Sequence, residues 1–176
     1  MDRFVVISGC SGGGKSTLLS ELKRRGYACV EEPGRRIIAD ELTRSGQALP
    51  WVNPSAFARR AVEMSLRDRG SALDTPGLVF FDRGLIDAAA ALEHVTGMPA
   101  LLAYASERYH KRVFITPPWP EIYVNDAGRK HSLQEAIDEY KRLMKAFASL
   151  EYDVELLPKV DVAKRADFIL GRLQSF

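Results

Sequence analysis

The residues best suited to chemistry form a glycine-rich run with a lysine and hydroxyl side chains near the amino terminus. This run fits the phosphate-loop pattern G-x-x-x-x-G-K-[ST] at every fixed position; it is Gly9-Cys10-Ser11-Gly12-Gly13-Gly14-Lys15-Ser16-Thr17. Its glycines let several backbone N–H groups point at one anion, and a following helix N-terminus adds partial positive charge. We therefore predict that this loop binds a nucleoside triphosphate, with Lys15 at the β- and γ-phosphates and Ser16 at Mg²⁺.

A second candidate is an acidic residue that ends an apolar run. Leu78–Phe81 is followed by Asp82-Arg83-Gly84, and a hydrophobic strand ending in aspartate is the Walker-B arrangement, whose carboxylate faces Mg²⁺ or its water shell. We expect Asp82 to bind Mg²⁺ and to orient or deprotonate an acceptor hydroxyl, and Arg83 to hold an anionic group. The alternative is that Asp82 caps the next helix and Arg83 pairs with Asp87 at i, i+4. The phosphate loop favours the functional role.

Charged side chains also follow the apolar run Tyr27–Val30. In open α/β sheets, ligands bind outside the carboxyl ends of the strands, which would place these side chains at a substrate. A solvated turn is an equally favoured interpretation. The side chains concerned are Glu31, Glu32, Arg35 and Arg36. Farther along, Trp51 either caps the core or offers a stacking surface for a flat substrate, and the core is the favoured interpretation.

A long segment at about residues 117–131 is proline-rich at its start and basic at its end. Loops of this length inside a compact domain are usually functional, often as lids. We predict that this segment is a lid and that Arg129 closes over the transferring phosphoryl group.

Two partial motifs bear on the choice of nucleotide. Asp74–Gly77 matches the D-x-x-G element of GTPases, but its apolar strand follows the motif instead of preceding it, so we interpret it as a turn. Lys159 and Asp161 partly match the guanine-reading motif N-K-x-D, which here lacks its asparagine. Lys159 is therefore a candidate contact to the base, ATP and GTP both stay open, and an ordinary turn is the favoured interpretation.

Alternating strand and helix patterns position these residues. Apolar runs predict strands at Phe4–Ile7, Tyr27–Val30, Leu78–Phe81, Arg112–Thr116 and Tyr152–Leu156. Helical signals predict helices at Lys15 to about Arg25, Pro54 toward Gly70, Leu85–Val95, Pro99 to about Tyr109, Leu133 onward and Val162 to about Leu173. The helix from Leu133 onward begins at a capping box, Ser132 to Glu135.

The helix after Ser132 is strongly amphipathic. Its apolar side chains recur at helical spacing and are expected to face inward; they are Leu133, Ile137, Tyr140, Met144 and Phe147. The charged side chains between them are expected to face water; they are Asp138, Glu139, Lys141, Arg142 and Lys145. We interpret these charges as a solvated face and not as part of a binding site.

Composition limits the remaining classes of function. The chain has 176 residues, 46% of them hydrophobic, which suits one α/β domain over residues 1–176. A formal net charge of +2 gives no reason to expect nucleic acid or a membrane as partner. Its 2 cysteines and 3 histidines have no metal-ligand spacing. We expect a cytoplasmic protein, monomeric or homodimeric, without a signal peptide or a membrane-spanning segment.

Taken in order, the phosphate loop, Glu32-Pro33, Asp82-Arg83-Gly84 and the arginine-bearing lid resemble the small phosphate-loop kinases of the nucleoside and nucleotide group. The segment Trp119…Tyr123-Val124-Asn125-Asp126…Arg129 resembles predicted AAA-type ATPases, and the chain is most similar to the kinase-like AAA domain of ribosylnicotinamide kinases. The resemblance implies a three-layer α/β/α fold with a five-stranded parallel sheet in the order 2-3-1-4-5, a helical cover and a lid.

The sequence therefore predicts a kinase that uses ATP and Mg²⁺ to phosphorylate a small metabolite, such as a nucleoside or a nucleotide. Lys15, Asp82, Arg83 and Arg129 are its candidate catalytic residues. The alternative is a nucleotide-binding switch or module that hydrolyses ATP or GTP slowly and signals to a protein or lipid partner. Dependence of turnover on an acceptor distinguishes the two.

Overall fold

A five-stranded sheet in the order β2-β3-β1-β4-β5 forms the centre of the molecule. All neighbouring strands are parallel. The computed structural model describes residues 3–122 and 132–174. Its strands are β1 (Phe4–Gly9), β2 (Ala28–Val30), β3 (Val79–Asp82), β4 (Arg112–Thr116) and β5 (Asp153–Leu156). The fold class and the strand order implied by the resemblance are confirmed.

The central strand β1 shows why both faces of the sheet are covered. All six of its residues are buried. Phe4 and Val6 belong to one apolar cluster, whereas Val5 and Ile7 belong to another on the opposite face. Successive side chains of a strand point to opposite faces, so an uninterrupted apolar run requires a layer of helices on each side.

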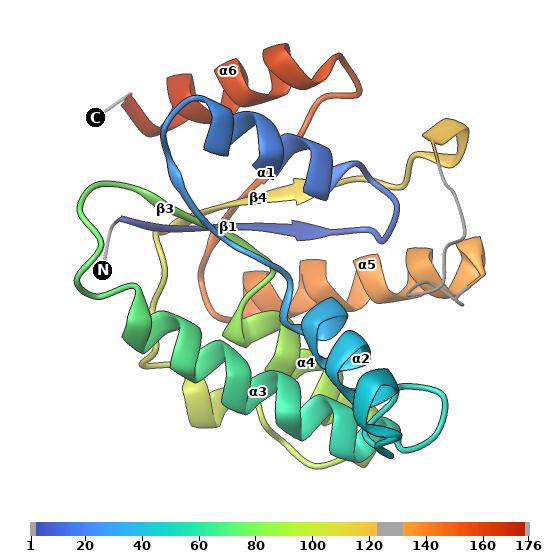
Figure 1. Ribbon diagram of the computed structural model, residues 1–176. Coiled ribbons are helices and arrows are strands. Elements are labelled where there is room, and N and C mark those ends of the chain that lie inside the picture. Colours follow the sequence, from blue (N-terminus) through green and yellow to red (C-terminus); the bar gives the residue numbers. More distant parts are fainter. Residues whose placement is uncertain (1–2, 123–131, 175–176) are drawn as a thin grey trace.

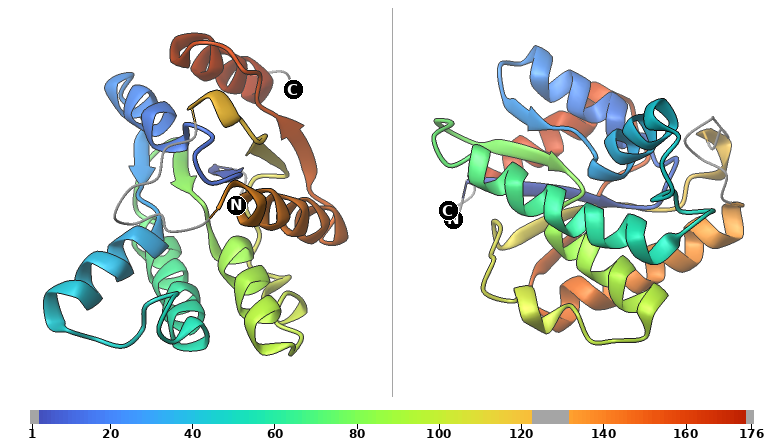
Figure 2. Two further views of the ribbon diagram at one scale, coloured as in Figure 1. Left: turned by 90° about the vertical axis from the view of Figure 1, so that its right-hand side faces the viewer. Right: turned by 60° about the horizontal axis from the view of Figure 1, so that its bottom comes forward.

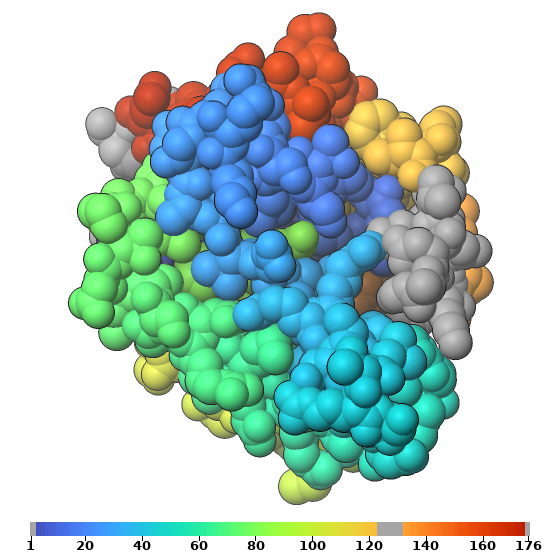
Figure 3. All heavy atoms as spheres, viewed as in Figure 1, coloured from blue at the N-terminus to red at the C-terminus, as the bar shows by residue number. Residues whose placement is uncertain are grey.

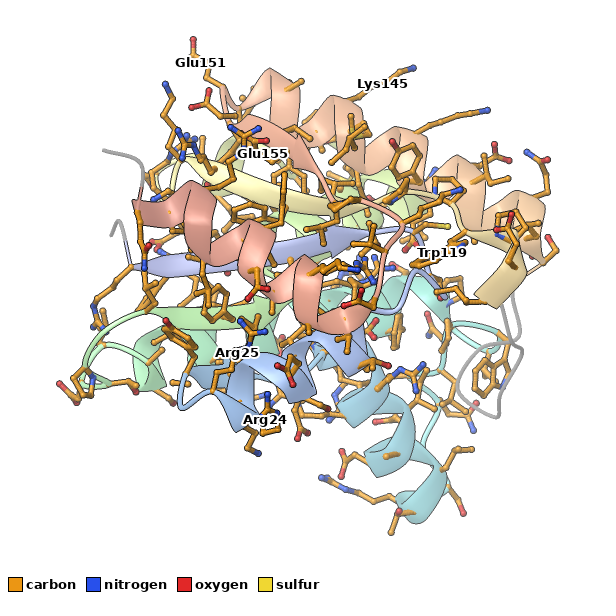
Figure 4. The ribbon with its side chains drawn as sticks, turned by 90° about the horizontal axis from the view of Figure 1, so that it is seen from above. Arg24, Arg25, Trp119, Lys145, Glu151 and Glu155 are labelled. Carbon is orange, nitrogen blue, oxygen red and sulfur yellow. The ribbon has the colours of Figure 1, made fainter. Side chains whose placement is uncertain are left out.

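The helices supply these two layers (Figure 1). They are α1 (Lys15–Arg24), α2 (Pro33–Arg44), α3 (Pro54–Ser71), α4 (Leu85–Thr96), α5 (Leu133–Ser149) and α6 (Val162–Gln174), with 3-10 turns at Leu102–Tyr104 and Pro120–Ile122. One layer consists of α1 and α6, and α3, α4 and α5 form the other. Arg25 follows α1 and donates to Asp167 of α6 at 2.6 Å (Figure 4). None of the described helices is both long and apolar enough to span a membrane.

The arrangement brings the carboxyl ends of the strands to one edge of the sheet, which faces the viewer in the left panel of Figure 2. The start of α1 lies at this edge. The hairpin of α2 and α3 projects beside it. Residues 9–17, 31–36 and 82–84 all follow carboxyl ends of strands and therefore meet here.

One expectation about helices is wrong. The predicted helix from Pro99 to Tyr109 is reduced to a 3-10 turn at Leu102–Tyr104. The N–H of Ala100 donates to Glu93, and the N–H of Tyr109 donates to the Tyr152 hydroxyl, so tertiary partners take these backbone donors. In α5, the predicted inward stripe is confirmed for Phe147, which is buried, and for Tyr140 and Met144, which pack against the core. The other fully buried positions of this helix are Ala136, Leu143 and Ala146.

Candidate functional site

The phosphate loop connects β1 to α1, and its shape depends on close contact with β4. Gly9 has a φ of 107°, and a Cβ on it would lie 2.4 Å from the Thr116 carbonyl oxygen. A Cβ on Gly13 would lie 2.7 Å from the Thr116 side chain. The N–H of Cys10 donates to the Thr116 carbonyl at 2.9 Å. Only glycine allows so close an approach at a positive φ, which gives the glycine pattern a steric cause.

Lys15 is the first residue of α1 and is buried against the loop. Its Nζ donates to the carbonyl oxygen of Cys10 at 3.0 Å. Burial lowers the pKa of Lys15 and Arg83 lowers it further, whereas Asp82 and Glu32 oppose the shift. A triphosphate in the loop would add negative charge beside this ammonium group and would stabilise its protonated form.

Asp82 ends β3 beside the loop and is buried, with 5% exposure. Its Oδ1 has no hydrogen-bond partner among the described residues. Burial and Glu32 raise the pKa of Asp82 to about 6, while Lys15 and Arg83 oppose the shift. Desolvation disfavours the carboxylate, so a cation beside it would restore its charged form.

The donor set around Asp82 fits Mg²⁺. Asp82 and Ser16 line the same cavity, and a carboxylate and a hydroxyl are oxygen ligands of the kind that Mg²⁺ takes from proteins. Within residues 3–122 and 132–174 there is no group of three or more His, Cys, Asp or Glu that could hold a metal ion. The remaining ligands would therefore be phosphate oxygens and water.

Arg83 lies at the centre of a cluster of carboxylates. It has a φ of 61°, which is rare outside glycine. Both of its Nη atoms donate to Glu139 of α5, at 3.0 and 2.9 Å. Its Nε lies 3.4 Å from Glu32 Oε1, and its Nη1 lies 3.9 Å from Asp87 Oδ1. Burial lowers the pKa of Arg83, but Glu139, Glu32 and Asp87 outweigh it and the net pKa is raised. The guanidinium is therefore charged and lies among carboxylates, and its Nε has no hydrogen bond to a described residue.

Asp87, not Asp82, caps the following helix. The N-cap of α4 is Gly84, whose N–H donates to Asp87 Oδ2 at 2.9 Å. The Ser8 hydroxyl donates to the other carboxylate oxygen of Asp87. Burial raises the pKa of Asp87, while Arg83 and Ser8 oppose the shift. This arrangement leaves Asp82 available to the cavity that it lines with Ser16.

Two neighbouring cavities share part of their walls. The phosphate cavity is lined by the loop, including Gly12, Lys15, Ser16 and Thr17. The side cavity lies between α2, α3 and α4 and is lined by Phe57, Ala61, Ala88 and others. The residues that line both are Ser11, Glu32, Arg35 and Arg83. Figure 3 shows the chain around residues 30–36, in light blue, between α1 above and α3 below.

The structure brings some predicted residues to the site and leaves others apart. Glu31 and Arg36 line the cavity of Ser16 and Asp82, and Arg36 pairs with Asp68 of α3. Trp51 is 39% exposed, and its role stays a prediction. The side cavity is lined by its neighbour Pro50, and Trp51 is not among the described lining residues. Lys159 is exposed after β5. Arg129 lies outside the described residues.

Two residues of the site were missed by sequence reasoning. The interpretation of Glu139 as part of a solvated face is wrong, because Glu139 pairs with Arg83 and lines the side cavity. Arg165 of α6 is 3% exposed, and its Nη2 donates to the Gly13 carbonyl at 3.1 Å. Its guanidinium lies 5.6 Å from the ring centroid of Trp119, which Figure 4 labels. Neither helix carries a local sequence signal for these contacts, which arise from packing.

Comparison with known proteins is consistent with this geometry. A family model described as an AAA domain matches residues 4–165. Among curated proteins, a nucleotide-binding protein of Burkholderia vietnamiensis is 27% identical over 160 residues, which cover 87% of this chain and 47% of that protein. The chain thus spans about half the length of the curated relatives it matches.

Solved structures of other proteins have the same fold, and a kinase is among them. The NadR protein in complex with NAD and AMP-PNP superposes with a TM-score of 0.69 at 17% identity, covering 99% of this chain and 50% of that chain. A deoxyadenosine kinase from M. mycoides with bound dATP gives a TM-score of 0.60 at 15% identity and covers 98% of this chain and 100% of that one. At such identities the likeness concerns the fold.

Proposed function

Because the chain belongs to the AAA-domain family, in a fold shared with phosphate-loop kinases, we propose that it is a phosphotransferase. In this proposal it moves the γ-phosphoryl group of ATP, in the presence of Mg²⁺, to a small metabolite such as a nucleoside or a nucleotide. We further propose that it acts in the cytoplasm.

The observation that carries the proposal is the junction of the two cavities. A binding module needs a place for the triphosphate, whereas a kinase needs a second place for the acceptor within reach of the γ-phosphate. Glu32, Arg35 and Arg83 line both cavities, so a group in the side cavity would adjoin one in the loop. This second compartment favours a kinase over a switch.

The proposed reaction is an in-line displacement. An acceptor oxygen forms a bond to the γ-phosphorus, the bond to the β–γ bridging oxygen breaks, and ADP leaves with the electron pair. Asp82 orients the acceptor hydroxyl and accepts its proton. Lys15 balances charge on the phosphates. Arg129 is proposed to close over the transferring group.

Mg²⁺ would be held by Ser16 and Asp82 and would neutralise charge on the phosphate oxygens. Arg35 is exposed at the edge of both cavities and would help to position the substrates. Ser11 and the loop glycines would hold the triphosphate through the backbone. No residue is assigned to contact the base of the nucleotide, and Lys159 stays a candidate.

The test is ADP formation from ATP and Mg²⁺ with and without a pool of nucleosides, nucleoside monophosphates and ribosylnicotinamide. We expect the pool to raise the rate at least tenfold, and Lys15→Ala to abolish the rise. Asp82→Asn should retain ATP binding and lose at least a hundredfold in turnover. A slow rate of ADP formation that no acceptor changes would instead support the nucleotide-dependent switch.

A further inference from the structure

The side cavity has an apolar wall that comes from regular spacing along two helices. Phe57, Ala61 and Ser65 are four residues apart along α3 and line the cavity together, as one helical face must. Ala88 and Ala91, which are three residues apart on α4, also line the cavity. The alanines leave room between the helices, and Phe57 is 3.3 Å from where a Cβ of Gly34 would lie. An aromatic ring and small side chains suit a flat, largely apolar ligand.

One polar atom in this wall lacks a protein partner. Ser65 is 2% exposed, and its Oγ has no hydrogen bond to any described residue. A buried hydroxyl without a partner destabilises a protein, so such groups are rare unless something outside the chain satisfies them. Ser65 lines the side cavity, where a ligand with a polar edge would supply the missing hydrogen bond.

The described charges at the mouth of the cavity do not favour an anionic ligand. Its described lining carries three carboxylates, Glu32, Asp87 and Glu139, against two guanidiniums, Arg35 and Arg83. If Asp87 is ionised, three negative charges face two positive ones, and if it is protonated, two face two. The described lining therefore carries no net positive charge in either state. Arg83 is already bound by both oxygens of Glu139 and lies close to Glu32. A phosphate or carboxylate on the acceptor would compete with Glu139 and Glu32 for this guanidinium, of which the Nε alone has no hydrogen bond to a described residue.

We infer that the acceptor is an uncharged or positively charged hydroxyl compound with a flat ring, of the nucleoside class, and that Glu139 selects against acceptors carrying a phosphate. The ring lies between α3 and α4, and its polar edge is hydrogen bonded by Ser65. The acceptor hydroxyl then lies toward Glu32, which lines both the side cavity and the cavity of Ser16 and Asp82. This inference rests on the proposed kinase function and names the substrate class of the same site.

The test compares nucleosides with their own 5′-monophosphates as acceptors, using ATP, Mg²⁺ and the full chain. The adenosine, cytidine, uridine and guanosine pairs differ only in the phosphate. We expect kcat/KM to be at least tenfold higher for a nucleoside than for its monophosphate. Glu139→Gln keeps the shape of the side chain and removes its charge, so it should reduce that preference at least tenfold, or about 1.4 kcal/mol.

Asp138→Asn is the matched control because Asp138 is the adjacent carboxylate on α5, exposed and paired with Lys141 instead of Arg83. It should leave the preference unchanged. If monophosphates are the better acceptors, or if Glu139→Gln and Asp138→Asn behave alike, the inference is overturned while the kinase function stands. If no acceptor raises the rate above that of Lys15→Ala, the proposed function fails and the inference fails with it.

Ser65→Ala tests the buried hydrogen bond separately. We expect a threefold to tenfold rise in the KM for the nucleoside, no change in the KM for ATP, and an unfolding temperature equal to or above that of the wild type. Ser71→Ala, at the exposed end of the same helix, is the control. A loss of stability without a change in acceptor KM would show that Ser65 is structural and would contradict its assigned role.

Discussion

The burial of Asp82 predicts that replacing a proposed catalytic residue stabilises the protein. Burial and Glu32 raise the pKa of Asp82 from its ordinary 3.8 to about 6. At about 1.4 kcal/mol per pKa unit, the ionised side chain destabilises the folded state by about 3 kcal/mol. Asp82→Asn removes this charge and keeps the shape, and Oδ1 loses no hydrogen bond with a described residue.

The effect depends on pH with a definite sign. The folded pKa lies above the unfolded one, so the protonated side chain favours folding, and this contribution is lost as the pH rises through about 6. The advantage of Asp82→Asn is therefore about 3 kcal/mol at pH 8, about half of that at pH 5, and below about 1 kcal/mol at pH 4.

Urea unfolding at these three pH values, without nucleotide or Mg²⁺, measures the difference. Asp138→Asn is the control, and its exposed position predicts a change within about 0.5 kcal/mol. The reasoning is refuted if Asp82→Asn is less stable than the wild type at pH 8, or if the difference does not grow with pH.

Three further predictions concern the loop, the metal and α5. Gly9→Ala places a Cβ 2.4 Å from a backbone oxygen of Thr116, so urea unfolding should show a loss of about 1–3 kcal/mol; wild-type stability would contradict the steric argument. Chelation of Mg²⁺ should stop phosphoryl transfer without lowering the unfolding temperature of the nucleotide-free protein, and a lower temperature would indicate a structural metal. Ser132→Ala removes the N-cap acceptor of the Glu135 N–H and should destabilise by about 0.5–2 kcal/mol in thermal unfolding; an unchanged midpoint would show that the cap contributes nothing.

The parts of the fold that the sequence predicts are those with local causes. The loop glycines are required by contact with Thr116, and the apolar run of β1 requires cover on both faces. Asp82 could be recognised because it ends a strand. The strand order was implied by the resemblance, since no local pattern specifies which strands are neighbours.

The site residues that were missed depend on contacts between distant segments. Glu139 lies 56 positions from Arg83, and Arg165 lies 152 positions from Gly13. Glu139 lies at the border of the buried face of α5, where a charged side chain can either face solvent or contact a partner. The sequence of this helix is compatible with both. Ser65 could not be identified from the sequence, because only the structure shows that its buried Oγ has no hydrogen-bond partner among the described residues. The helix predicted from Pro99 failed because Glu93 and Tyr152 bind its backbone donors.

The measurement that tests the central claim most directly follows the γ-phosphoryl group itself. The full chain is incubated with γ-³²P-labelled ATP, Mg²⁺ and a mixture of nucleosides, and the labelled products are separated. The account predicts label in an organic phosphate ester, at a level that Lys15→Ala abolishes. Label found in inorganic phosphate alone, at a rate that no acceptor changes, would contradict it.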